Sequence, residues 1–342
     1  MDEGQRAAAV SADPTGDSAF ADAHRRLEGL RVLLDHVIVG QSELITHLVT
    51  AVFAGGHVII EGLPGLGKTH LAKAIAAALG LRSARVQCTP DLLPADVTGA
   101  EIYLTASGGA SSFEFRPGPV FAQLVLVDEI NRATPRTQAA LLEAMQERQV
   151  THAGVTHPLP SPFCVLATQN PIELEGTYPL PEAQLDRFMF KLMVPFPARE
   201  SLRRMLDVSL DAEPSDTLQP IASPADVLSI MRLARTVLLG DRCKEAAVDL
   251  VVATQPETGG APADARRHIR YGASPRALQS LVRAARVRAL MAGRSHVDVD
   301  DLDSVALPVL RHRVLLRLES ELDGLDADAT LASIIGAWRR RL

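Results

Sequence analysis

One segment has the residue types and the spacing of a loop that holds phosphate groups. Residues 62–69 read Gly-Leu-Pro-Gly-Leu-Gly-Lys-Thr and match the pattern GxxxxGK followed by Ser or Thr at every required position. The glycines let backbone N–H groups face the phosphates, Lys68 neutralises the β- and γ-phosphates, and Thr69 offers its hydroxyl to Mg²⁺. The residues predicted to contact the nucleotide are Gly62, Leu63, Pro64, Gly65, Leu66, Gly67, Lys68, Thr69 and the adjoining His70.

Two adjacent carboxylates end an apolar run further along the chain. Residues 124–127 read Leu-Val-Leu-Val and are followed by Asp128 and Glu129. Ligands bind at the C-terminal ends of strands in open α/β sheets, so this pair is placed for chemistry on the nucleotide. We expect Asp128 to hold Mg²⁺ and Glu129 to act as the general base for the attacking water. On its own, such a pair is more often ordinary turn chemistry, and its interpretation depends on the phosphate loop.

A third polar residue follows the next apolar run. Residues 165–168 read Val-Leu-Ala-Thr and lead to Gln169, Asn170 and Pro171. If this run is a neighbouring strand, the Asn170 amide lies beside Glu129 and can orient the water. Asn-Pro is also a common start of a turn, so this role depends on the order of the three motifs.

The residues between the motifs predict the elements that position them. Apolar residues recur at helical spacing over 20–34 and in a second run that ends at residue 53. Short buried-strand patterns begin near residues 57, 85, 124, 163 and 189. Because helical segments separate several of these strands, we predict an α/β fold with a parallel sheet covered by helices on both faces.

Two inserts and a helical C-terminal part complete the predicted organisation. Alternating patterns over 101–116 and 149–157 predict two β-hairpins with small-residue turns. Beyond Pro195 and Pro197 the strand patterns stop and helical patterns continue to the C-terminus. The predicted division is a disordered tail (1–18), an α/β nucleotide-binding core (19–197) and an α-helical lid domain (198–342).

The composition is that of an ordinary globular chain. Its 342 residues are 47% hydrophobic and 22% charged, and the formal net charge of −6 gives no overall attraction for nucleic acid or anionic lipid. The cysteines and histidines form no zinc motif, so no metal site made of protein ligands alone is expected. Without a signal-like start or a long apolar segment, we predict a cytoplasmic protein that is not inserted in a membrane.

Taken in order along the chain, these motifs resemble those of AAA+ ATPases. The resemblance covers the phosphate loop (Walker A), the strand with the acidic pair (Walker B) and Asn170 (sensor 1). It extends to Leu-Asp-Arg-Phe at 185–188 and Gly-Ala-Ser-Pro-Arg-Ala at 272–277. Within that superfamily, the sequence is similar to the MoxR family, and the similarity lies in segments 89–94, 128–133, 167–171 and 181–188. The two hairpin inserts also fit this clade.

The resemblance implies roles for residues that carry no signal by themselves. Arg187 corresponds to the arginine finger that reaches the ATP of a neighbouring subunit, and Arg276 corresponds to sensor 2 on the small domain. Val39 and Gly40 match the segment that contacts adenine, and Gln87 is the candidate for a polar residue that restrains the catalytic glutamate. Without the family, either arginine would be interpreted as an ordinary surface residue.

The implied activity is Mg²⁺-dependent hydrolysis of ATP by a homo-oligomeric, hexameric ring. Such a ring acts as a chaperone-like remodeller of protein clients, which in this family include proteins with von Willebrand factor A domains. The alternatives are a nucleic-acid motor of the same clade and the ATPase subunit of a chelatase-like complex. A nucleic-acid motor needs basic or aromatic residues at its hairpin tips. Because residues 106–111 and 153–154 contain only Ala, Ser and Gly, no nucleic-acid partner is expected.

Overall fold

The computed structural model describes residues 14–63, 65–105, 111–171, 176–207 and 218–342. Pro64 of the phosphate loop, residues 106–110 of the first hairpin tip and residues 1–13 of the predicted tail lie outside these ranges. No helix within the described residues is both long and apolar enough to cross a membrane.

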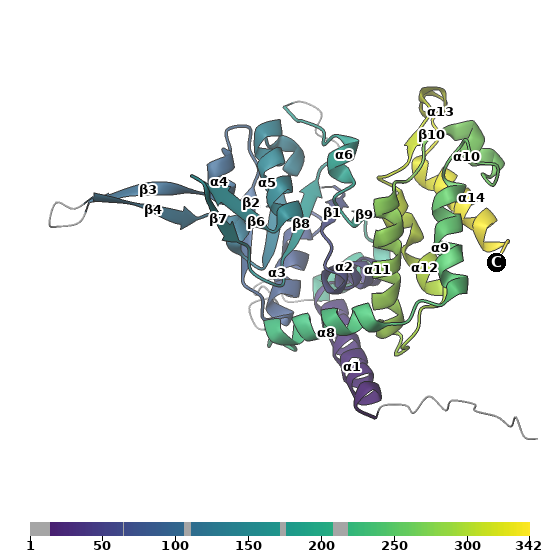
Figure 1. Cartoon of the computed structure of the whole chain (residues 1–342), viewed down its shortest axis with the longest axis horizontal. Helices are drawn as coiled ribbons and strands as arrows, with labels where there is room; N and C mark the ends of the chain where they lie inside the picture. The colour runs from purple at the N-terminus through teal and green to yellow at the C-terminus, as the bar shows by residue number, and fades with distance from the viewer. Residues whose placement is uncertain (1–13, 64, 106–110, 172–175, 208–217) are drawn as a thin grey trace, which may run out of the picture.

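Within the described residues, five strands pair in parallel to form the central sheet shown in Figure 1. In spatial order they are β2 (Ser83–Gln87), β5 (Leu124–Asp128), β8 (Cys164–Gln169), β1 (Val58–Glu61) and β9 (Phe190–Met193). Each predicted strand is present, and the predicted parallel α/β sheet is confirmed. Because all strands point the same way, the ends that follow β1, β5 and β8 lie at one edge of the sheet.

Alternate residues of the strands supply two hydrophobic clusters, one on each face of the sheet. In β5, Leu124 and Leu126 join a cluster that includes buried residues of α1, α2, α3 and the C-terminal helices. Val125 and Val127 join a second cluster that includes buried residues of α4 and α5. The helices named here are α1 (Pro14–Val37), α2 (Ser42–Ala54), α3 (Lys68–Ala78), α4 (Pro94–Thr98) and α5 (Pro135–Glu147). The first cluster therefore joins the core and the C-terminal helices.

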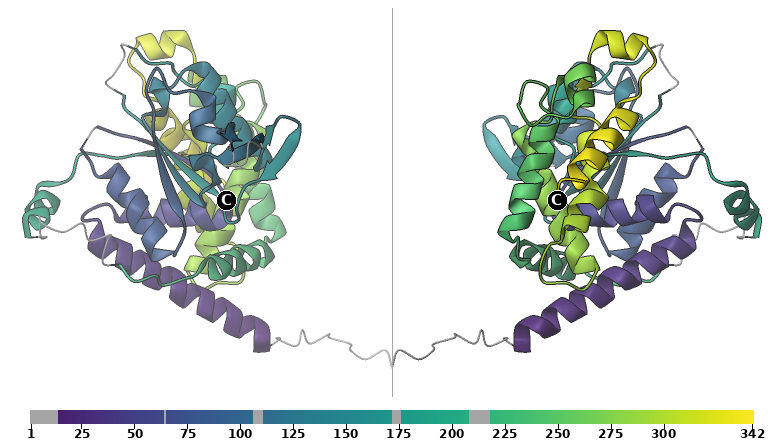
Figure 2. Two further views of the ribbon diagram at one scale, coloured as in Figure 1. Left: turned by 90° about the vertical axis from the view of Figure 1, so that its left-hand side faces the viewer. Right: turned by 90° about the vertical axis from the view of Figure 1, so that its right-hand side faces the viewer.

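Helix α1 starts earlier than the sequence predicted. It begins at Pro14, so the residues from 14 to 18 are helical rather than part of a disordered tail. Between Pro14 and Phe20 the hydrophobic residue is Ala19, which is too little to show helical spacing, although proline is favoured in the first turn of a helix. Figure 2 shows α1 on the outside of the molecule, where it contacts α2, α3 and α11 (Pro275–Met291).

Both predicted hairpins are present. The first, β3 (Gly99–Thr105) and β4 (Ser111–Pro117), extends away from the body of the molecule in Figure 1. The second consists of β6 (Gln149–His152) and β7 (Val155–Pro158). Phe115 of β4 stacks on His157 of β7, with ring centroids 4.1 Å apart. The two inserts therefore contact each other through aromatic rings.

The C-terminal part is mainly helical. Its elements are α8 (Pro224–Thr236), α9 (Asp241–Ala253), α10 (Ala263–His268), β10 (Ile269–Tyr271), α11, α12 (Val299–Leu310), β11 (Leu315–Leu316), α13 (Leu318–Leu322) and α14 (Ala327–Arg339). The remaining helices are η1 (Pro119–Phe121), η2 (Ile130–Arg132), α6 (Glu182–Leu185) and α7 (Arg199–Asp207). The short antiparallel pair β10–β11 was not predicted, because two or three residues are too few to show an alternating pattern. Helix α11 packs against both α2 and α12, which places it between the core and the outer helices.

Candidate active site

The phosphate loop joins the end of β1 to the start of α3. Gly65 and Gly67 have φ of +80° and +77°, and a Cβ at either position would meet no neighbouring atom within 4 Å. The loop therefore needs glycine for its backbone conformation rather than for space. Lys68 Nζ donates to Gly62 O at 2.6 Å, which holds the ammonium over the loop. Partial burial lowers the pKa of Lys68, while the nearby carboxylates act in the opposite direction.

Asp128 receives hydrogen bonds on both carboxylate oxygens. Thr168 Oγ1 donates to Oδ1 at 2.6 Å, and Thr69 Oγ1 donates to Oδ2 at 3.2 Å. Arg85 Nη2 also donates to Oδ2, at 2.9 Å. The hydroxyl of Thr69 and the carboxylate of Asp128 thus lie side by side at the loop. This pair of hard oxygen donors fits Mg²⁺ bound beside a nucleotide phosphate.

Glu129 is held in an unusual backbone conformation. Its φ of 56° and ψ of 51° lie in the left-handed region, which directs its side chain away from that of Asp128. The N–H of Glu129 donates to Thr168 Oγ1 at 2.9 Å. Its Oε2 accepts hydrogen bonds from Gln87 Nε2 at 3.0 Å and from Arg132 Nη1 at 3.1 Å. Gln87 therefore contacts the glutamate, as the resemblance implied.

Asn170 completes a cavity of about 400 Å³ at the carboxyl edge of the sheet. The cavity is lined by Gly65, Leu66, Gly67, Lys68, Thr69, His70, Lys73, Asp128, Glu129, Thr168 and Asn170. Asn170 is buried, and Asn131 Nδ2 donates to its carbonyl at 3.5 Å. The predicted loop residues and the three polar residues after β5 and β8 are thus brought together. Gly62 and Leu63 belong to the same loop but do not line this cavity.

Arg187 and Arg276 lie together at a different cavity, of about 320 Å³. The other charged side chains of its lining are Arg148, Arg283, Arg313 and Asp186. None of its lining residues also lines the phosphate cavity. Arg187 Nε is buried without a hydrogen-bond partner in the described part of the chain, and the Arg276 side chain is 51% exposed. This second cavity is therefore strongly positive.

Gly40 lies at a third cavity, of about 550 Å³, between the start of α2, the end of β9 and helix α12. A Cβ at Gly40 would collide with Ser201, and its φ of +81° also favours glycine. The next residue, Gln41, donates from Nε2 to Leu66 O at 3.3 Å, which ties this turn to the phosphate loop. Val39 lies in the same turn but does not line the cavity.

Several residues of the site were not found from the sequence. Arg85 lies two positions before Gln87 on β2, so strand alternation could have placed both on one face. Thr168 directly precedes the Gln-Asn-Pro segment, and Arg132 lies one turn after Glu129. The position of each residue in the sequence was a weak signal. It could be interpreted only once the neighbouring strand was known.

The comparisons with known proteins agree with this geometry. Residues 57–190 match the family described as "ATPase family associated with various cellular activities (AAA)", and residues 262–334 match the AAA lid domain. Chaperone MoxR1 of Mycobacterium tuberculosis is 39% identical over 96% of this chain and 85% of its own length. Protein MoxR of Paracoccus denitrificans is 37% identical over 88% and 91%, respectively.

Solved structures show the same fold. A protein from Cytophaga hutchinsonii described as an inferred ATPase has a TM-score of 0.86 and 39% identity, and the match covers 94% of this chain and 96% of that one. A full-length MCM homolog from Methanopyrus kandleri has a TM-score of 0.55 and 19% identity over 90% of this chain and 64% of that one, which shows a shared fold alone. The chain belongs to the MoxR family of AAA+ ATPases and is an enzyme that hydrolyses ATP.

Proposed function

We propose that this protein is the motor subunit of a hexameric ring in which each ATP is cleaved between two chains. The proposal is carried by the separation of the candidate residues into two cavities. Asp128 and Glu129 line one cavity, whereas Arg187 and Arg276 line another that shares no residue with it. A head-to-tail ring would place the second cavity of one subunit against the first cavity of the next, and so complete every site.

Each residue then has a distinct role in hydrolysis. The loop N–H groups and Lys68 bind the β- and γ-phosphates of ATP. Thr69 and Asp128 would hold Mg²⁺, which would offset the negative charge of the phosphates. Glu129 accepts a proton from the attacking water, and Asn170 orients that water. The turn at Val39 and Gly40 would contact the adenine.

The neighbouring subunit contributes its two arginines. The guanidinium groups of Arg187 and Arg276 bind phosphate oxygens of the ATP held by the adjacent chain. An arginine finger contributes on the order of 10³-fold or more to turnover, so hydrolysis depends on assembly. Gln87 and Arg132 hold the Glu129 carboxylate, and this restraint must loosen before the carboxylate reaches the water.

The work of the ring is the chaperone-like remodelling of protein clients. Tyr103 and Phe113 form a cross-strand pair on the projecting β3–β4 hairpin, and their exposed fractions are 61% and 69%. Exposed aromatic rings of this kind suit an apolar segment of another protein. The name of one relative, Chaperone MoxR1, supports the proposal of a chaperone-like role. Proteins with von Willebrand factor A domains are the client class that we propose to test first.

A nucleic-acid motor is the second candidate, because the same aromatic pair could stack on bases. Two glutamates, Glu101 and Glu114, and one arginine, Arg116, are exposed on this hairpin, so a phosphate backbone would meet net negative charge there, which supports a protein client. The ATPase subunit of a chelatase-like complex would use the same hydrolytic site and would differ in its partner.

Subunit mixing tests whether ATP is cleaved between two chains. Arg187→Ala and Glu129→Gln subunits are each expected to bind ATP and to hydrolyse almost none, with turnover reduced about 10³-fold for the arginine variant. In a mixed ring, some interfaces pair an intact Glu129 with an intact Arg187 of the neighbour. Turnover of the mixture is therefore expected to exceed that of either variant alone. If subunits exchange and the mixture stays inactive, Arg187 does not act in trans.

The client is sought with the Glu129→Gln variant, which is expected to hold ATP and keep the assembled state. Incubation with purified von Willebrand factor A domain proteins, with and without ATP, measures whether binding depends on the nucleotide. The matched control is a Tyr103→Ser, Phe113→Ser double variant in the same background. If the Glu129→Gln protein and its Tyr103→Ser, Phe113→Ser derivative retain equal amounts of the client, the hairpin is excluded as the client site.

A further inference from the structure

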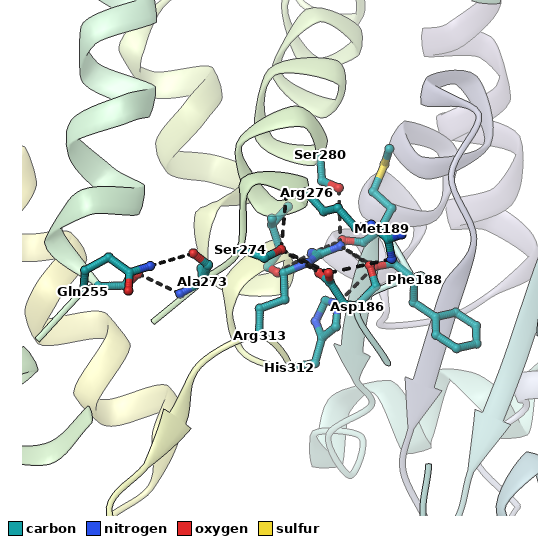
Figure 3. Close-up of polar contacts among 12 residues, drawn as sticks. Asp186, Phe188, Met189, Gln255, Ala273, Ser274, Arg276, Ser280, His312 and Arg313 are labelled. Carbon is teal, nitrogen blue, oxygen red and sulfur yellow. Dashed lines mark hydrogen bonds and ion pairs between the residues drawn. The ribbon is translucent and has the colours of Figure 1, made fainter. Parts of the chain in front are cut away.

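Arg313 is a buried arginine that holds the chain segment on either side of Arg187. Its side chain is 2% exposed, and its Nε donates to Asp186 Oδ1 at 2.7 Å. Its Nη2 donates to the carbonyl oxygens of Asp186 and Phe188 at 3.1 and 2.6 Å, and its Nη1 donates to Met189 O at 3.1 Å. One guanidinium therefore fixes the backbone just before and just after Arg187, as Figure 3 shows.

The same carboxylate also fixes the start of the helix that carries Arg276. Ser274 Oγ donates to Asp186 Oδ2 at 3.0 Å and accepts the N–H of Arg276 at 3.2 Å. Arg276 Nη1 lies 3.9 Å from Asp186 Oδ2. The preceding residue, Ala273, is itself held by Gln255, whose Nε2 donates to Ala273 O at 2.8 Å (Figure 3). Asp186 thus links the segment around Arg187 in the core to the N-terminus of α11.

The ion pair between Arg313 and Asp186 is not by itself a strong source of stability. Burial lowers the pKa of its guanidinium, while the hydrogen bond and the charge of Asp186 act in the opposite direction. Because desolvation offsets the attraction between buried charges, replacing both members of such a pair with apolar side chains is often neutral, whereas losing one member leaves the other charge buried and unpaired. An arginine adds a planar fork of donors, and here the fork is spread over three carbonyl groups of one short segment.

We propose that Arg313 is a positioning residue that holds Arg187 and Arg276 in one rigid unit, so that both face the ATP of the neighbouring subunit together. This inference rests on the proposed cleavage of ATP between two chains. Arg313 lies on the segment after α12 and also donates to Val309 O at 2.6 Å. A movement of α12 therefore moves the segment with Arg187 and the start of α11 together. The position of the lid in one subunit therefore determines where its two arginines lie relative to the ATP of the next subunit.

The test uses Arg313→Lys, which keeps the charge and loses the planar fork. We expect the affinity for a non-hydrolysable ATP analogue to stay within about threefold, because the phosphate cavity is unchanged. Turnover is expected to fall by about 10- to 100-fold, since a displacement of about 1 Å is enough for such a loss. In the double variant Arg187→Ala, Arg313→Lys, the second substitution is expected to add only the part of its loss that acts through Arg276, so the two losses are less than additive.

Subunit mixing separates this role from a general loss of structure. Arg313→Lys subunits retain an intact Glu129, and Glu129→Gln subunits retain intact arginines, so their mixture is expected to recover turnover. A chain whose own ATP site was damaged would show no recovery. If this mixture stays inactive while the Arg187→Ala and Glu129→Gln mixture recovers, the inference about Arg313 is wrong and the shared site stands. If neither mixture recovers although subunits exchange, the shared site itself is wrong.

Matched variants control for lost ion pairs and lost helix caps. Arg294 pairs with the nearly buried Asp301 elsewhere in the lid, and Arg294→Lys is expected to change turnover by less than about twofold.

Should Arg313→Lys fail to fold, Ser274→Ala removes one bond to Asp186 and leaves Arg313 in place. Ser223→Ala removes a comparable N-cap from α8 without touching Asp186. Lower turnover in Ser274→Ala, with rescue by mixing, supports the inference, whereas equal effects of the two serine variants would overturn it.

Discussion

At the residue scale, Thr168 sets the positions of two candidate site residues, Asp128 and Glu129. Its hydroxyl donates to Asp128 and accepts the N–H of Glu129, so one side chain fixes the end of β5. The left-handed backbone of Glu129 costs a residue with a Cβ about 1 kcal/mol or more. Such a conformation is retained where its geometry is needed, and here it turns the two adjacent carboxylates toward different targets.

The roles assigned to Lys68 and Glu129 predict different defects. Lys68→Ala is expected to weaken ATP binding by about 10- to 100-fold, because a charged hydrogen bond to phosphate is lost. Glu129→Gln is expected to keep its ATP affinity and to lose about 10²-fold or more in turnover, because general-base catalysis acts only in the reaction. Titration with a fluorescent ATP analogue and a steady-state hydrolysis assay measure the two quantities separately.

The control for the loss of a lysine charge is Lys244→Ala, which removes an exposed ion pair with Asp241 on α9. This variant is expected to bind and hydrolyse ATP as the unaltered protein does. An equal loss of affinity in Lys68→Ala and Glu129→Gln would show that the two residues do not have separate roles.

At the element scale, the sequence predicted those strands and hairpins whose pattern of apolar and polar residues lies within one continuous segment. Each central strand is an apolar run, and three of the strands lead directly into a motif, so the sheet and the phosphate cavity followed from the sequence. The hairpins followed from alternation around small residues. The Arg313 contacts could not be predicted, because Arg313 and Asp186 are 127 positions apart and only the packing of lid on core brings them together. The paired arginines of the second cavity depend on the same packing.

A buried histidine joins three elements of the core. His57 precedes β1, its Nδ1 accepts the N–H of Val165 at 3.0 Å, and its Nε2 contacts Met145 O at 3.3 Å. Burial lowers its pKa from an ordinary value of 6.5 to about 4, and the charges of Arg148 and Arg283 act in the same direction. The folded protein therefore favours the neutral ring.

We expect the free energy of unfolding to fall as the pH decreases from 6.5 toward 4. The folded-state pKa lies below that of the unfolded chain, so the stabilisation by neutral His57 is complete above pH 6.5 and is lost below it. A shift of this size corresponds to about 3 kcal/mol. Urea titrations across this pH range measure the effect in the unaltered protein and in His57→Asn.

The variant is expected to be less stable at neutral pH and to show a shallower pH dependence. His312 is also buried, and its pKa lies well below its ordinary value, but it is present in both proteins. The difference between the two curves therefore reports His57. Parallel curves would mean that His57 titrates normally in the folded state.

At the scale of the whole molecule, the candidate residues for ATP hydrolysis are divided between two cavities. The phosphate cavity holds Lys68 and Lys73 beside Asp128 and Glu129, so its lining charges balance, whereas the second cavity has several arginines around Asp186. Bound ATP would add negative charge to the first cavity, which would favour head-to-tail association with the positive cavity of the next chain over a symmetric dimer. The hairpin inserts project from the core and are free to contact a client.

The charge of the whole molecule also allows a prediction of how ATP hydrolysis responds to nucleic acid. The net charge is −6, and Glu101 and Glu114 are exposed along the projecting hairpin, so a phosphate backbone meets no extended basic surface there. We expect single- and double-stranded DNA and RNA to change turnover by less than about twofold at low salt. Steady-state assays with each polynucleotide, at about 50 mM and about 200 mM salt, measure the response.

The salt dependence decides how any stimulation is interpreted. Contacts to phosphates release counterions, so genuine tracking along nucleic acid would give several-fold stimulation that weakens steeply between the two salt concentrations. The Tyr103→Ser, Phe113→Ser variant then tests the hairpin, because stacking on bases would be lost with the rings. Salt-sensitive stimulation that disappears in this variant would favour the nucleic-acid motor over the client remodeller. If polynucleotides leave turnover unchanged and a protein client raises it, the result would support Tyr103 and Phe113 as a contact surface for a polypeptide.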